Sequence, residues 1–300
     1  MAALLQTPLP ALNDSEAERL PESLPAVVDA HVHLFPDHLF KSIWQWFDQY
    51  GWPIRYRLKS TEIVEFLLAH GISRIVGLHY AHRAGVAREL NGYMSALCRR
   101  YPQLTGMATV FPGEKNTGQI LAEAFDAGLA GVKLHCHVQC FDMLGEAMHE
   151  IYRICQASDK PIIMHVGREP KSPAYPCDPY ELCSAERLER VLSEYSDLRI
   201  CVPHLGADEF DAYQRLITHY DNLWLDTTMT LADYLPFCNV PDLATMRADR
   251  LMYGSDFPNL PYAWDREIQR ILRRKLNPDR LLKLFGQNAV DFYAIDMEAI

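Results

Sequence analysis

The sequence predicts a protein of the α/β class, a (β/α)8 (TIM) barrel. Short apolar runs alternate with segments whose apolar residues recur every three or four positions, the period of an amphipathic helix. We count eight of these runs, and most are apolar throughout, as expected of parallel strands buried on both faces. The chain has 300 residues and no Gly/Ser linker or charge block, which suits a single barrel of roughly 250 residues.

The alternation gives a predicted element order over residues 26–300, which we expect to form one domain. The predicted strands cover 26–32, 72–78, 104–110, 130–135, 161–166, 198–204, 222–227 and 250–255. The predicted helices between and after them cover 61–70, 85–101, 117–127, 142–157, 184–195, 208–220, 230–248, 262–275 and 278–294. Gly71 and Gly128 follow two of these helices, and glycine is the usual residue just past a helix end.

Two segments lie outside this alternation. Residues 1–25 mix prolines with polar and apolar residues, so we predict an arm lying on the surface. Residues 35–60 form an aromatic-rich insertion after the first strand, and Phe40, Trp44 and Phe47 have helical spacing. The insertion could be a packed helix, a cap over a pocket mouth or a subunit contact. The last alternative would make the protein a homodimer.

Composition limits the classes of partner. Hydrophobic residues make up 49% and charged residues 23% of the chain, as in globular proteins, and no apolar stretch reaches the roughly 20 residues needed to span a bilayer. The net charge of −10 argues against nucleic acid or an anionic membrane as the main partner. The N-terminus has no secretory signal pattern and the eight cysteines form no dense framework, so we expect a cytoplasmic, reduced protein.

The first strand carries the strongest functional signal, Val27-Val28-Asp29-Ala30-His31-Val32-His33. In an extended strand, residues two apart project from the same face, so His31 and His33 point to one place where the strand ends. Imidazole is the commonest metal ligand in proteins. The pair therefore suggests half of a metal site.

Polar residues close four other predicted strands in the same way. In a barrel of this kind, the functional groups sit at the carboxyl ends of the strands. Each residue alone has an ordinary explanation, such as a buried histidine, a turn cap or a lysine that reaches solvent, but their joint occurrence predicts a metal centre. These residues are Lys133 in Gly131-Val132-Lys133-Leu134-His135, His165 in Ile163-Met164-His165-Val166-Gly167, His204 in Pro203-His204-Leu205-Gly206, and Asp256 in Gly254-Ser255-Asp256-Phe257-Pro258.

With these motifs, and with Asn288-Ala289 near the end, the chain resembles the amidohydrolase superfamily, in its amidohydrolase-2-like branch of metal-dependent hydrolases and decarboxylases. The resemblance covers about 26–295. It implies a (β/α)8 barrel with His31, His33, His165 and Asp256 around a catalytic divalent ion, usually Zn²⁺. Three nitrogens and a carboxylate that leave room for water suit zinc as a Lewis acid.

Lys133 decides between one ion and two. In binuclear members of the superfamily a lysine on the fourth strand is carbamylated and bridges two metals, and His165 and His204 would then bind the second ion. In mononuclear relatives, including aromatic and muconate-type decarboxylases, that position differs and the histidine after the sixth strand is catalytic. The segment His135-Cys136-His137-Val138-Gln139 is similar to the stretch that follows the fourth strand in the decarboxylases. We favour one ion.

The same segment allows a different interpretation. Cys136 and Cys140, with His135 and His137 beside them, could form a structural zinc knot. No second cysteine pair occurs at zinc-finger spacing, which argues against it.

The leading hypothesis is hydrolysis of an ester, lactone or amide in a small, carboxylated substrate. A bound ion would lower the pKa of its water, Asp256 would act as the general base, and His204 would polarise the carbonyl or support the oxyanion. Arg168 could bind a substrate carboxylate through its fork of donors. His79 and Tyr175 are weaker candidates for substrate contact.

Two alternatives remain. One is non-oxidative decarboxylation of an aromatic or muconate-like acid, which the aromatic insertion would suit. The other is a non-catalytic barrel that binds a metal only for structure, although structural zinc sites are usually closed by four protein ligands.

Overall fold

Eight parallel strands form the centre of the molecule, as the sequence predicts. The structure, a computed structural model, describes residues 11–168, 172–235 and 239–295. The strands are β1 (Val28–His33), β2 (Arg74–Leu78), β3 (Leu104–Gly106), β4 (Val132–His135), β5 (Ile162–His165), β6 (Ile200–Val202), β7 (Leu223–Asp226) and β8 (Leu251–Met252). They pair in sequence order in two ladders, one from β1 to β3 and one from β4 to β8.

Hydrogen bonds just beyond the regular pairs join the two ladders into a closed barrel. Ala108, which follows β3, donates its backbone N–H to the carbonyl of Gly131, before β4, at 2.8 Å. On the other side, the N–H of His33 in β1 donates to the carbonyl of Phe257, after β8, at 2.8 Å. Closure leaves none of the eight described strands with an exposed edge, and the barrel predicted from the sequence is confirmed.

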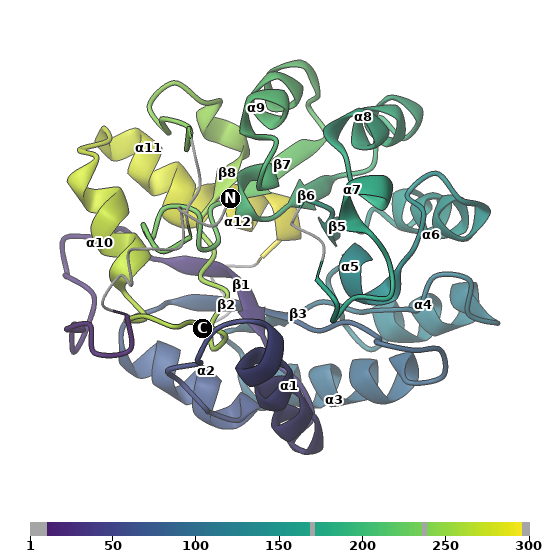
Figure 1. Cartoon of the computed structure of the whole chain (residues 1–300), viewed down its shortest axis with the longest axis horizontal. Helices are drawn as coiled ribbons and strands as arrows, with labels where there is room; N and C mark the ends of the chain where they lie inside the picture. Colours follow the sequence, from purple (N-terminus) through teal and green to yellow (C-terminus); the bar gives the residue numbers. More distant parts are fainter. Residues whose placement is uncertain (1–10, 169–171, 236–238, 296–300) are drawn as a thin grey trace.

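Most of the helices lie around the strands (Figure 1). They are α1 (Asp37–Tyr50), α2 (Ser60–Ala69), α3 (Ala87–Arg100), α4 (Thr117–Asp126), α5 (Cys136–Gln139), α6 (Glu146–Ala157), α7 (Pro179–Leu182), α8 (Ala185–Glu194), α9 (Phe210–His219), α10 (Arg266–Arg273), α11 (Pro278–Leu282) and α12 (Asn288–Tyr293). Two 3-10 turns, η1 (His204–Gly206) and η2 (Ala248–Arg250), and a π-helical turn, η3 (Lys283–Gln287), are the other helical elements among the described residues.

Helix α8 illustrates why the sequence forms these helices. The Ser184 side chain caps its start by accepting a hydrogen bond from the backbone of Arg187, which satisfies one of the free N–H groups of the first turn. Leu188, Val191 and Leu192 form its buried face, at the three- and four-residue steps that predict an amphipathic helix.

The prediction of a helix over 230–248 is wrong. Of its residues, those at 230–235 and 239–247 are in turns and irregular structure, and the 3-10 turn η2 follows only at Ala248. Asp233 and Asn239 have left-handed backbone angles, with φ of 51° and 59°, and Pro241 lacks the N–H that a helix would use. Apolar residues at helical spacing pack here as a loop instead.

The alternation of side chains along the strands divides the interior into two layers. Val132, Leu134 and similar residues face outward and pack under the helices. Ile163 and Trp224 belong to a second cluster inside the barrel, together with Phe292 of α12. Since side chains alternate along a strand, the inward face of Ile163 and Trp224 continues to residues two positions later, His165 and Asp226.

Strand β1 contains an irregularity that affects the predicted histidine pair. Its pairing register with β2 shifts between Asp29 and Val32. Val28 and Ala30 lie in the inner cluster, whereas Val32, two residues further on, lies in the outer layer. The shift, typical of a β-bulge, lets His31 and His33 face the same interior site.

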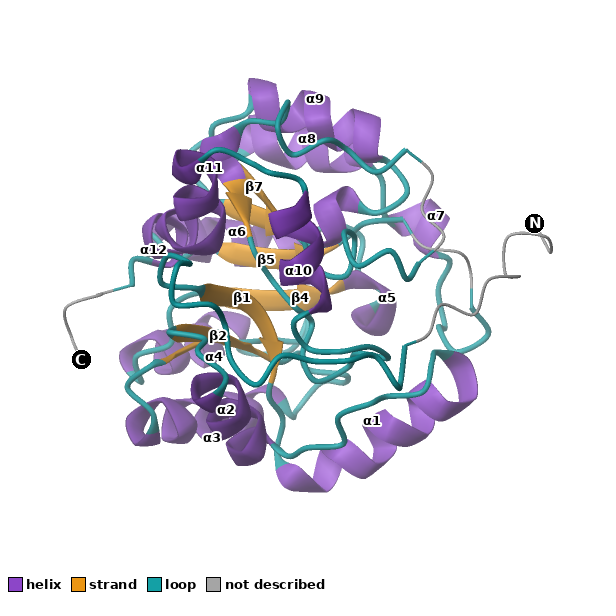
Figure 2. Ribbon diagram, turned by 90° about the vertical axis from the view of Figure 1, so that its left-hand side faces the viewer, coloured by secondary structure: helices purple, strands orange, loops and turns teal. Residues whose placement is uncertain are grey.

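The insertion and the arm both lie against the barrel. Helix α1 lies at the same end of the molecule as α5 and α7, which follow β4 and β5 (Figure 2). In the arm, of which residues 11–25 are described, Glu16 forms an ion pair with Arg55 at 2.9 Å, and Leu20 is buried. The expected arm residues 1–10 lie outside the described residues.

Candidate functional site

The structure brings His31, His33 and Asp256 together at the carboxyl end of the barrel. One ligand atom from each lies within 4.8 Å of the others. Asp256 Oδ1 is 2.9 Å from His33 Nε2 and 3.6 Å from His31 Nε2. All three side chains are buried. Two imidazoles and a carboxylate that converge in this way form a donor set for a divalent transition metal.

Asp226, at the end of β7, fixes this group from behind. Its Oδ2 is 2.9 Å from His31 Nδ1, so Nδ1–H donates and Nε2 keeps its lone pair toward the cluster. Its Oδ1 accepts the backbone N–H of His204 at 3.2 Å. A carboxylate behind a histidine ligand is a common way to set the tautomer and ring orientation of that ligand.

Asp29 connects the two strands that carry the ligands. Ser255 donates its backbone N–H at 3.0 Å and its hydroxyl at 2.5 Å to the Asp29 carboxylate, and the backbone of His31 donates at 3.2 Å. Because Ser255 precedes Asp256, these bonds hold the start of the Asp256 loop against β1.

The charges in the cluster are those that metal binding requires. Burial, with the nearby charge of Lys133, holds the pKa of His31 well below its usual value. Burial also lowers the pKa of His33. Burial acts to raise the pKa of Asp256, but the hydrogen bond from His33 and the charges of nearby histidines outweigh it and the net pKa is lowered. Neutral imidazoles and an ionised carboxylate are the ligand forms.

The predicted catalytic residues have an unusual backbone. His204 has φ of 57° and Asp256 has φ of 70°, in the left-handed region that side chains other than glycine rarely adopt. Such conformations cost of the order of 1–3 kcal/mol each and concentrate at functional sites. The surrounding hydrogen bonds, including that from Asp256 N to the His31 carbonyl at 2.9 Å, hold the loops in place.

His204 lies across the site, and its ring centre is 6.1 Å from that of His31 and 4.7 Å from that of His165. Its Nδ1 is 2.9 Å from the Thr228 carbonyl, which can only accept, so Nδ1 carries the proton. In the neutral ring Nε2 then offers a lone pair. His204 can therefore accept a proton or bind a metal as it stands, and it must be protonated before it can support an oxyanion.

Lys133 is fully buried beneath this site. Its Nζ is 3.4 Å from His31 Nε2, and burial lowers its pKa to about 8. The lysine therefore reaches the candidate metal site from β4, as the two-ion scheme requires.

His165 falls into a second group of three histidines, with His135 and His137. His135 pairs with His165 in the β4–β5 register, and their rings are stacked 4.0 Å apart. The structure thus places three of the predicted ligands in one cluster and the fourth in a neighbouring one. In the sequence, His135 and His137 suggested a zinc knot with cysteines and a similarity to the decarboxylases, but not a group with His165.

Both clusters border one cavity of about 400 Å³. Its wall also includes Trp46, Phe47 and Tyr50 of α1, and Trp52 just after it. Trp52 is held by a hydrogen bond from its indole N–H to the Asn259 carbonyl at 2.7 Å. The aromatic insertion is thus part of the pocket wall, opposite the polar strand ends.

Arg168 and Tyr175, both predicted to contact substrate, line this cavity. Arg168 Nε donates to the Cys183 carbonyl at 3.0 Å and lies 3.5 Å from a carboxylate oxygen of Glu209. The Tyr175 ring is 5.7 Å from the Trp46 ring. Arg168 therefore adds a cationic side chain to a wall that also carries aromatic rings.

His79, the third predicted contact residue, does not line the cavity. Its ring is fully buried, and its Nε2 is 3.2 Å from Asn91 Oδ1. Asn91 in turn donates to the Thr109 carbonyl at 3.0 Å. The structure places His79 in a polar contact between β2 and α3.

The burial of His79 predicts a pH effect on stability. Burial lowers its folded-state pKa to about 4, below the 6.5 of an exposed histidine, so on acidification the unfolded chain binds a proton first. The contribution of His79 to the free energy of unfolding is fully present above pH 6.5. About 3 kcal/mol is lost as the pH falls toward 4. Urea unfolding at pH 7 and pH 4.5 should show a smaller loss of stability for His79→Gln than for wild type. The exposed His219→Gln should behave as wild type, and equal losses for all three would contradict the prediction.

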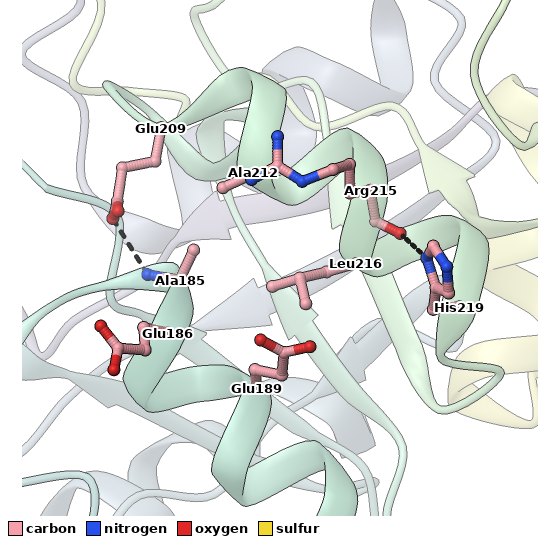
Figure 3. A pocket seen from close by; sticks show the side chains of 8 residues that line it. All are labelled: Ala185, Glu186, Glu189, Glu209, Ala212, Arg215, Leu216 and His219. Carbon is pink, nitrogen blue, oxygen red and sulfur yellow. Dashed lines mark hydrogen bonds between the residues drawn. The ribbon is translucent and has the colours of Figure 1, made fainter.

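A second cavity, of about 350 Å³, lies between α8 and α9 (Figure 3). Figure 3 shows the Glu209 carboxylate bonded to the backbone N–H of Ala185, at 3.0 Å, and His219 bonded to the Arg215 carbonyl. None of the residues that line it belongs to either histidine cluster. This second cavity is therefore separate from the histidines and the aspartate at the strand ends.

Replacement of Asp226 tests the support behind the metal ligands. Asp226→Asn should weaken metal binding 10- to 100-fold, because an amide at this place can present its N–H₂ to His31 and reverse the tautomer. The affinity is measured by titration of metal-free protein. The surface variant Asp221→Asn should bind like wild type, and an unchanged affinity in Asp226→Asn would show that the carboxylate does not orient His31.

Asp226 was missed in the sequence although a signal was present. It ends the apolar run Leu223-Trp224-Leu225-Asp226, as the other site residues end theirs. The role of Asp29 was not assigned either, because its partner Ser255 lies 226 positions away.

Comparisons with known proteins agree with this architecture. No curated protein matches the sequence. A 5-carboxyvanillate decarboxylase from Novosphingobium aromaticivorans, solved with manganese and 4-hydroxy-3-methoxy-5-nitrobenzoic acid, has a similar structure, with 18% identity and a TM-score of 0.69 over 93% of this chain and 99% of that one. A probable 2-pyrone-4,6-dicarboxylic acid hydrolase from Acinetobacter baumannii, with citric acid bound, has 16% identity and a TM-score of 0.60 over 90% and 100%.

An uncharacterised TIM-barrel protein from Bordetella bronchiseptica is also similar, at 19% identity and a TM-score of 0.67 over 89% of this chain and 98% of that one. In the described part of the chain, no helix is long and apolar enough to cross a membrane. The sequence model of the amidohydrolase family, in its amidohydrolase-2 branch, matches residues 28–295. The chain therefore belongs to the amidohydrolase family.

Proposed function

We propose that the protein is a metal-dependent hydrolase that cleaves an ester, lactone or amide in a small carboxylated substrate. The observation that carries the proposal is the convergence of His31, His33 and Asp256 within 4.8 Å on a cavity that Arg168 also lines. Three protein ligands beside a cavity leave room for water or substrate, whereas structural zinc sites are closed by four. This supports a catalytic rather than a structural role.

The bound ion would supply Lewis acidity, lowering the pKa of water and polarising the carbonyl; we expect Zn²⁺. Asp256, ionised and in contact with His33, takes the proton from the attacking water and returns it to the leaving oxygen or nitrogen. His204 accepts or holds a proton through Nε2. Arg168 and the aromatic wall orient the substrate, the first through its charge and the second by stacking.

Arg168 should determine the affinity for the carboxylate. Arg168→Met is expected to raise KM for a carboxylated substrate about 10- to 100-fold, the loss of one charge-assisted hydrogen bond, with a smaller change in kcat. Arg168→Lys should recover part of the affinity because it keeps the charge. An equal effect on an uncharged analogue would mean that Arg168 only supports the loop.

Decarboxylation is the second candidate. The aromatic wall of Trp46, Phe47 and Tyr175 would suit a planar acid, and a 5-carboxyvanillate decarboxylase is among the similar structures. The ion would then bind the substrate carboxylate, with Asp256 or His204 moving a proton at carbon.

One screen separates the two reactions. Purified protein loaded with Zn²⁺ or Mn²⁺ is assayed with lactones and esters of aromatic or unsaturated dicarboxylic acids, and with carboxylated phenols. The proposal expects acid release from the first group without carbon dioxide from the second. Carbon dioxide release without any hydrolysis would establish the decarboxylase instead.

A further inference from the structure

We propose that His135, His137 and His165 form a second metal site, which binds a divalent transition-metal ion separate from the ion on His31, His33 and Asp256. The inference goes beyond the proposed function, since that function needs only the first ion. It also differs from the binuclear scheme considered for the sequence, in which a carbamylated Lys133 joins the metals.

The three histidines bring their ligand atoms close together. The three ligand atoms lie within 4.8 Å of one another. A tetrahedral ion with Zn–N bonds of about 2.0–2.1 Å holds its nitrogens roughly 3.4 Å apart. Binding would therefore draw the ligand atoms together by about an ångström and turn the His135 ring out of its stack on His165, because imidazole binds a metal in the plane of its ring. The His137 ring meets the His165 ring edge-on at 4.8 Å, while His135 stacks on His165 at 4.0 Å, and the three rings come from β4, α5 and β5.

The surrounding chain sets the state of His137. Its Nε2 is 3.0 Å from the Gly167 carbonyl, and a carbonyl only accepts, so Nε2 carries the proton. The neutral ring then has its lone pair on Nδ1. A backbone carbonyl behind a metal-binding histidine is a usual means of fixing that tautomer.

His135 is held equally firmly. Its backbone N–H donates to Gln139 Oε1 at 2.8 Å, and the Gln139 amide donates to the carbonyls of Ala81 and Val110 at 3.0 and 2.9 Å. His135 Nδ1 is buried and has no hydrogen-bond partner among the residues that the structure describes. Buried polar atoms are nearly always satisfied, so an atom of this kind in a group of three imidazoles points to a ligand.

The donor set indicates the class of ion. The group contains no carboxylate, and imidazole ligands suit Zn²⁺, Co²⁺, Ni²⁺ and Cu²⁺ rather than Mg²⁺ or Ca²⁺. His135 and His165 line the cavity, so a fourth position on this ion would face the same space as the first ion. His165 could bind either ion, so His135 and His137 are the ligands that distinguish the second site from the first.

Metal counting with matched variants tests the proposal. Metal-free protein is reloaded with Co²⁺, dialysed, and measured by elemental analysis and visible absorption. Wild type should hold two Co²⁺ per chain, and His135→Gln and His137→Gln one each. His31→Gln should also hold one, with a different spectrum from that of the His135 variant. The exposed His82→Gln, on the adjoining groove, should keep two.

The outcomes are distinct. One Co²⁺ in wild type, or two in both His135→Gln and His137→Gln, would overturn the second site. The fully buried His137 variant could fail to fold. Two measurements would then still test the second site. One is the metal content of His135→Gln, at the cavity wall. The other is X-ray absorption of wild type with two ions, in which one ion should have only nitrogen ligands from the protein. If wild type binds one ion and His31→Gln binds none, the second site is wrong but the proposed function stands. If wild type binds two ions but hydrolyses no substrate, the proposed function is wrong but the second site stands.

Discussion

Asp256→Asn is expected to lower kcat/KM by about 10²- to 10⁴-fold, the usual contribution of a general base. The substitution keeps the shape of the side chain but removes the negative charge that accepts the proton and binds the ion. The hydrogen bond and charges of the histidines hold the pKa of Asp256 below its usual value, so the native group is ionised at neutral pH. Steady-state kinetics on the best substrate of the screen would measure the loss.

The control for this variant is Asp211→Asn, the same change on the exposed surface of α9. It should have wild-type kinetics. Circular dichroism should show that Asp256→Asn is folded, since the barrel closes through backbone bonds that the substitution leaves in place. A folded variant with metal bound and full activity would remove Asp256 from the mechanism.

Removal of metal is expected to abolish activity completely and to lower Tm. The ligands sit on β1 and just after β8, the junction where the barrel closes, so an ion there joins the two ends of the sheet. Binding at a concentration 100 times Kd stabilises a protein by about 2.7 kcal/mol, which corresponds to a shift in Tm of several degrees for a chain of this size. Activity and Tm are measured after chelation and dialysis, and again after addition of Zn²⁺, Mn²⁺ or Co²⁺.

A chelator already saturated with metal serves as the control and should leave both quantities unchanged. Recovery with one of the three ions also identifies the preferred metal. Full activity in protein that retains less than about a tenth of an ion per chain would contradict metal-dependent catalysis.

Local patterns in the sequence were sufficient to predict the barrel and much of the site. Runs such as 161–166 and 72–78 are short and apolar throughout, as strands buried on both faces are. The helices instead have apolar residues at three- and four-residue steps. The same local rule placed His31, His33 and Asp256 at strand ends, where they converge. It failed at 230–248, because left-handed turns at Asp233 and Asn239 break a segment whose apolar spacing looks helical.

The sequence by itself determined that polar ligands end the strands, since alternation along a strand depends only on the order of residues. The tertiary structure decided which ligands share an ion. The bulge in β1 brings His31 and His33 toward Asp256, and the register of β4 against β5 places His135 beside His165. Such contacts depend on register and strand curvature, which bring together residues far apart in the chain and leave no local pattern.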